Sequence, residues 1–114
     1  MMSDVRQDVV DAKNFFDRPF LYLTQNFYVM KAALRYYSVK KGMSFTSSKL
    51  ADSFPISTPV AGSCLKILNE LEVVEARSES SSPDRYMPED VDIGRLQEIE
   101  KVLVESKEIQ KFVN

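Results

Sequence analysis

Apolar residues recur at steps of three and four along most of the chain, which is the spacing of one buried face of an α-helix. An aromatic-rich segment interrupts the pattern, and Arg18-Pro19 is expected to break the first helix there. A short helix is also predicted over residues 46–54. The longer helices are predicted from Ser3 to about Phe16, from about Gln25 to Lys41, from about Thr58 to Leu71, and from about Val91 to Val113.

The stretch 46–87 organises the rest of the chain. Its opening hydroxyl residues can cap the start of a helix, which Pro55 then stops. Ser57 supplies a second helix start, with Pro59 at the first helical position, where its missing N–H costs nothing. Because only about three residues separate the two helices, the pattern predicts a helix-turn-helix.

Short extended segments surround this pair of helices. The segments VVEAR and RYM flank the polar loop SESSSPD, and together they predict a β-hairpin. Residues 43–45 alternate between apolar and polar, which fits the small first strand implied by the family resemblance given below. The predicted fold class is therefore mainly α with a small β-hairpin: a helix-turn-helix with a wing, an extra N-terminal helix and a long C-terminal helix.

Three segments carry a resemblance to a known family: LADSF, ISTPVAGSCLKILNELEVVEAR and RYM. Over residues 26–88 the chain resembles the winged helix-turn-helix domain of small prokaryotic transcriptional regulators, the broad ArsR-like and MarR-like group. The resemblance implies a DNA-binding domain at 25–88, an N-terminal helix and aromatic segment at 1–24, and a C-terminal dimerisation helix at 89–114.

The charge distribution agrees with a DNA-binding middle segment. The formal net charge is -2, but residues 18–69 hold seven basic residues against one acidic residue, whereas residues 70–114 hold six against twelve. A basic segment that coincides with a helix-turn-helix is the electrostatic pattern expected of a DNA-binding surface. The alternative interpretation is a solvated helix face that lacks acids.

Phosphate contacts are better supported than base contacts. The second helix of the motif has small residues facing outward in its first turns and no outward Arg, Asn or Gln, so strong base discrimination is not expected. Arg77 and Arg85 flank the predicted wing, where they either reach phosphates or border a solvated turn. The residues predicted to contact DNA are Thr46, Ser47, Ser48, Lys49, Ser57, Thr58, Pro59, Ala61, Gly62, Ser63, Lys66, Arg77 and Arg85.

The last predicted helix has apolar residues on more than one side and needs a partner. In the regulators that the chain resembles, terminal helices commonly build the dimer, and we expect the same here; the alternative is a helix folded back on its own domain. The predicted dimer interface comprises Leu96, Ile99, Leu103, Ile109, Phe112 and Val113.

Composition argues against other classes of function. The chain of 114 residues has the length of one domain, contains no histidine and has a single cysteine, Cys64. It therefore lacks the commonest general base and the usual Cys/His zinc ligands, so we predict no enzyme activity, metal or cofactor. Cys64 is interpreted as a packed thiol, with a redox-sensing thiol or an intermolecular bridge as the alternatives. Without a leader or an apolar span, the protein is expected to be cytoplasmic and not in a membrane.

The leading hypothesis is a homodimer that binds double-stranded DNA, sequence-selectively or generally, in transcriptional regulation. The alternative is a winged-helix module that binds protein through its aromatic N-terminal segment or its last helix, without direct DNA binding. A third possibility is a regulator that senses an effector in an aromatic pocket near Phe20, Tyr22 and Phe27.

Overall fold

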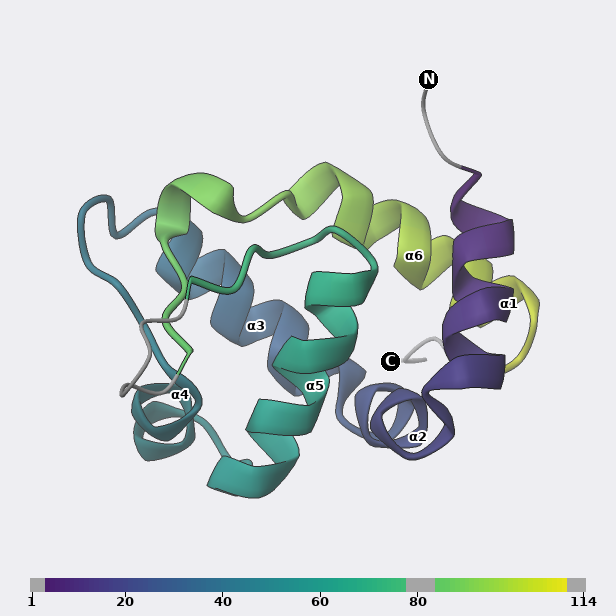
Figure 1. Ribbon diagram of the computed structural model, residues 1–114, viewed down its shortest axis with the longest axis horizontal. Coiled ribbons are helices and arrows are strands. Elements are labelled where there is room, and N and C mark those ends of the chain that lie inside the picture. Colours follow the sequence, from purple (N-terminus) through teal and green to yellow (C-terminus); the bar gives the residue numbers. More distant parts are fainter. Residues whose placement is uncertain (1–3, 78–83, 111–114) are drawn as a thin grey trace.

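The computed structural model describes residues 4–77 and 84–110, and these residues fold as an all-helical protein (Figure 1). Apolar side chains from all of its α-helices meet in one hydrophobic core. The three predicted segments 1–24, 25–88 and 89–114 therefore share that core. In order, the elements are α1 Val5–Phe15, α2 Asp17–Gln25, α3 Phe27–Ser38, α4 Ser47–Ser53, α5 Thr58–Glu70, the 3-10 turn η1 Pro88–Asp90 and α6 Ile93–Glu105.

The predicted β-hairpin and first strand are wrong. Residues 4–77 and 84–110 contain no β-strand, and only two isolated antiparallel bridges occur, Phe45 with Tyr86 and Arg77 with Arg85. The winged fold is therefore not supported. The loop tip, residues 78–83, lies outside the described residues.

Backbone groups that a hairpin would need are bound elsewhere. The carbonyl of Val73 accepts a hydrogen bond from Asp92 N at 2.8 Å, and Ala76 N donates to Asn69 Oδ1 at 3.0 Å. Val73 and its neighbour Val74 are both buried, so their side chains do not alternate between core and solvent as those of a one-sided strand would. The segment after α5 consequently runs as an irregular connection.

Helix α5 lies at the centre of the lower part of the fold as Figure 1 shows it, with α4 on one side and α2 on the other. Its inner residues fill the space between these helices, and Cys64 is fully buried among them. The other buried residues of α5 are Ala61, Leu65, Ile67 and Leu68.

The predicted hydroxyl caps of both motif helices are confirmed. Thr46 Oγ1 accepts a hydrogen bond from Lys49 N at 3.2 Å at the start of α4. Ser57 Oγ accepts one from Val60 N at 3.4 Å at the start of α5. These bonds satisfy amide groups that have no partner within the helix, so the two starts are set by local sequence.

The aromatic segment is itself a helix, which differs from the prediction. The chain bends at Phe16, and α2 then begins at Asp17 with Pro19 inside its first turn. Proline is tolerated there because the first-turn amides have no intrahelical acceptor. Phe20 and Leu23 of this helix enter the core.

Helix α6 ends well before the predicted end at Val113. Lys107 adopts a left-handed backbone with φ of 63°, and the N–H groups of Glu108 and Ile109 turn back to the carbonyl of Leu103 at 2.9 and 3.2 Å. This is the hydrogen-bonding pattern of a helix C-cap, made here without a glycine.

The apolar stripe of α6 is buried within the chain that carries it, against α1 and α3. Leu96, Ile99 and Leu103 are at most 1% exposed, and Ile109 is 6% exposed. The structure therefore gives no support to a dimer built through these residues, and it favours the alternative of a helix folded back on its own domain. Phe112 and Val113 lie outside the described residues.

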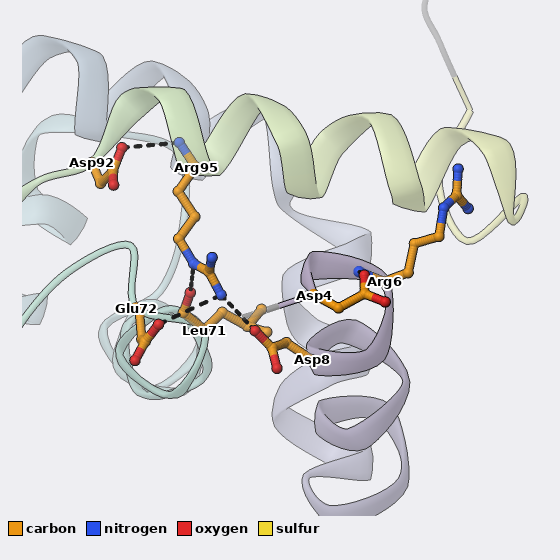
Figure 2. A network of polar contacts seen from close by, with 7 residues as sticks. All are labelled: Asp4, Arg6, Asp8, Leu71, Glu72, Asp92 and Arg95. Carbon is orange, nitrogen blue, oxygen red and sulfur yellow. Dashed lines mark hydrogen bonds and ion pairs between the residues drawn. The ribbon is translucent and has the colours of Figure 1, made fainter. Parts of the chain in front are cut away.

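Arg95 of α6 joins α1 to the end of α5 (Figure 2). Its Nε donates to the carbonyl of Leu71 at 2.5 Å, and an Nη pairs with Asp8 Oδ2 of α1 at 2.7 Å. Glu72, whose φ of 65° is left-handed, lies 3.6 Å from the same guanidinium. The side chain of Arg95 is only 15% exposed, so these contacts are partly shielded from water.

No helix among residues 4–77 and 84–110 is both long enough and apolar enough to cross a membrane.

Replacing Arg95 by Met should lower the free energy of unfolding by about 1.5–3 kcal/mol, because a charged donor to the Leu71 carbonyl and the partner of Asp8 are both lost. Urea unfolding followed by circular dichroism measures this change. The matched control, Lys101→Met, removes an exposed cation from the same helix and should change stability by less than about 0.5 kcal/mol. Equal effects of the two substitutions would contradict the role given to Arg95.

Stability should fall with alkaline pH partly through Cys64. Burial raises the pKa of its thiol from 9.0 to about 12, so the folded state keeps the proton while the unfolded thiol ionises. The stability that this group contributes is complete below pH 9 and is lost as pH rises toward 12. The stability advantage of wild type over Cys64→Ala should therefore shrink above pH 9 in denaturation curves measured at successive pH values. A difference in stability between wild type and Cys64→Ala that stays constant up to about pH 11 would contradict this prediction.

Candidate nucleic-acid interface

The predicted contact residues lie on α4, on the first turns of α5 and beside the bridge between Arg77 and Arg85. In Figure 1, α4, the N-terminal end of α5 and the turn after α3 occupy the end of the molecule opposite α1. Most of the predicted residues reach the surface there. The exposed ones are Ser48, Lys49, Ser57, Thr58, Pro59, Lys66, Arg77 and Arg85, and the partly buried ones are Thr46, Ser47, Gly62 and Ser63.

Ala61 is the exception, because it is fully buried and cannot touch DNA. Gly62 is also less open than predicted. A Cβ placed on Gly62 would lie 3.8 Å from the side chain of Ser47, so this side of α5 faces the start of α4. Lys66 follows four residues later on the same side of the helix and is exposed.

The hydroxyl groups at the two helix starts already have partners. Those of Thr46 and Ser57 act as caps, as described above, and Pro59 has no backbone N–H to offer. Ala61 N donates to the Ser57 carbonyl at 2.8 Å. The first turn of α5 therefore offers a phosphate few backbone donors, and side-chain cations have to supply most of the attraction.

The two arginines predicted to flank the wing differ. Arg77 Nε donates to Asp90 Oδ2 at 3.1 Å, and its Nη lies 2.9 Å from the same oxygen, so its charge is already paired. Arg85 is exposed and forms no ion pair among the described residues. Their backbones exchange hydrogen bonds of 2.8 and 2.9 Å, which holds both at the base of the loop.

Four of the seven described cations in the acidic flanks, residues 1–17 and 70–114, form ion pairs within the protein. Arg6 pairs with Glu105, Lys13 pairs with Glu108, and Arg95 pairs with Asp8, so α1 and the C-terminal segment satisfy each other. Lys31 of α3 pairs with Glu100 at 2.6 Å.

The remaining cations of the basic middle segment have no ion pair within the described ranges. Their charge is therefore not compensated by a fixed protein carboxylate, and it is available to an external anion. These residues are Arg18, Arg35, Lys40, Lys41, Lys49 and Lys66.

Sequence reasoning omitted Lys40 and Lys41 from the candidate contacts. The sequence predicts a helix that continues to Lys41, but α3 ends at Ser38 and both lysines stand in the exposed turn that leads to α4. Gly42 sustains this turn with φ of 81° and donates its N–H to Glu89 Oε1 at 3.0 Å. The signal available in the sequence was the pair of lysines directly before a glycine.

Within the described part of the chain, no three His, Cys, Asp or Glu side chains are grouped so that they could hold a metal ion. The one thiol is fully buried with a pKa of about 12, which keeps it protonated and unreactive at neutral pH.

Comparison of this chain with protein-family models, with curated proteins and with solved structures finds no match.

Proposed function

We propose that this protein binds double-stranded DNA through a surface that we call the basic face, formed by Lys40, Lys41, Lys49, Lys66 and Arg85. The single observation that carries the proposal is that these cations have no ion-pair partner among the described residues. Neutralising phosphates with such cations releases counterions from the duplex, which supplies a large share of the affinity of many DNA-binding proteins.

The arrangement of α4 and α5 supports a duplex as the polyanion. Two helices joined by a short turn, with the second exposed at its N-terminal end, suit contact with a groove and its bordering phosphates. Lys49 on α4 and Lys66 on α5 would lie over phosphates, while Thr58 and Pro59 approach the groove. Part of the negative charge of the acidic flanks is paired with their own cations.

Transcriptional regulation is the biological role that we propose for this binding, with the protein acting as a homodimer. Since the stripe of α6 is buried, the dimer would use another apolar surface. Val10, Phe15 and Leu21 are large, exposed apolar residues of α1 and α2, and Phe15 is 79% exposed. These helices lie away from α4, so a second subunit there would leave the basic face open (Figure 1).

Fluorescence anisotropy should show binding to a labelled duplex, with affinity that falls steeply as salt rises. Five phosphate contacts predict a slope of up to about -4.5 for the logarithm of the association constant against the logarithm of salt concentration. Absence of binding at low salt, or binding that salt does not weaken, would refute the proposed phosphate contacts.

The double substitution Lys49→Glu and Lys66→Glu should weaken duplex binding at least about tenfold and make the salt slope shallower by about 2. The matched control reverses two exposed cations outside the basic face, Lys101→Glu and Lys107→Glu, and so makes the same change in net charge. This control should bind DNA nearly as wild type. If both variants lose affinity equally, net charge and not the basic face governs the binding.

A protein-binding module is the second candidate function, and the exposure of Phe15 favours it. An aromatic ring left so open on a small protein is a frequent anchor of a protein interface. Under this alternative, Phe15→Ser would abolish capture of the partner while the variant Lys49→Glu with Lys66→Glu would retain it. Duplex binding with the expected salt dependence decides in favour of the first candidate.

A further inference from the structure

We infer that the basic face recognises the sugar-phosphate backbone of duplex DNA without regard to base sequence. This inference rests on the proposed function and states what kind of DNA the same surface accepts. It follows from examining which side chains near the basic face could reach the base edges.

Strong base discrimination requires side chains that can make two hydrogen bonds to one base, chiefly Arg or Lys to guanine and Asn or Gln to adenine. The first turns of α5 present Thr58 and Pro59 at the surface, with Ser63 partly buried. Ala61 is closed off by the core, and Gly62 has no side chain and faces α4. None of these residues can form a two-bond contact with a base.

Asn69 is the only carboxamide residue in α5. Its Oδ1 accepts the hydrogen bond from Ala76 N at 3.0 Å, which holds the connection after α5 in place. An adenine contact needs the amide oxygen and nitrogen together, so Asn69 cannot read a base while it keeps this structural bond. Asn69 also lies in the last turn of α5, far from the exposed N-terminal end.

Arg77 is unavailable for guanine, because both its Nε and its Nη contact Asp90 Oδ2. Lys66 lies more than two turns after Thr58, away from the N-terminal end of α5 that would enter a groove, so we assign its ammonium group to a phosphate. Lys40, Lys41, Lys49 and Arg85 come from three further segments, the turn after α3, α4 and the base of the loop. All four lie outside α5, and we assign them to the phosphate backbone as well.

The experiment compares duplexes of about 25 base pairs that have unrelated sequences but equal length and base composition, each as competitor against one labelled duplex. The full-length protein should bind all of them within about threefold, with the same salt slope, because phosphates are common to every sequence. Lys49→Glu with Lys66→Glu should lower every affinity by the same factor. Selection from a random duplex pool should yield no consensus after repeated rounds.

A preference of about a hundredfold or more for one sequence, or a consensus from the selection, would overturn this inference and leave duplex binding intact. Failure to bind any duplex at low salt would instead overturn the proposed function, and the inference with it. Affinities that differ from duplex to duplex in their response to Lys49→Glu and Lys66→Glu would also overturn the inference, since a phosphate contact weakens all sequences alike.

Discussion

The guanidinium of Arg95 connects three parts of the chain that are far apart in sequence: α1, the end of α5 and α6 (Figure 2). Planar donors with fixed geometry can serve a backbone carbonyl and a carboxylate at once, which an ammonium group does less well. The contact with Leu71 lies where α5 ends, so Arg95 helps to define the length of the central helix. The position of α5 in turn determines which of its residues face α4 and which reach solvent.

Charge segregation follows from this architecture. The acidic C-terminal segment and the mixed-charge α1 pack together and are joined by long-range ion pairs. The basic middle segment is left with cations that have no such partners in the described ranges, apart from Lys31. A protein with a net charge of only -2 can therefore contain a segment whose cations lack fixed carboxylate partners.

Local signals in the sequence were sufficient for α4 and α5, because Thr46, Ser57 and Pro59 act within one helical turn of the residues that they cap. The hairpin was predicted wrongly because the carbonyl of Val73 and the N–H of Ala76 are bound by Asp92 and Asn69, contacts that the sequence does not reveal. The end of α6 was missed for a related reason. Lys107 takes a left-handed conformation that sequence patterns associate with glycine.

The positive charge of the candidate surface could be predicted from the sequence, but the accessibility of its individual side chains could not. The count of basic residues identified the basic middle segment. The burial of Ala61, the hydrogen bond of Asn69 and the ion pair of Arg77 depend on tertiary packing. Whether the apolar stripe of a helix is covered by its own chain also depends on tertiary packing. The stripe of α6 looks unpartnered in the sequence and is fully covered in the fold.

Cys64 gives the protein a practical property. It is the only cysteine in the chain, and its side chain is buried in the core. A cysteine introduced at an exposed position such as Thr58 would be the single thiol accessible to a maleimide dye in the folded protein. Fluorophores or spin labels can therefore be attached beside α5 with the native residue left in place and its packing intact.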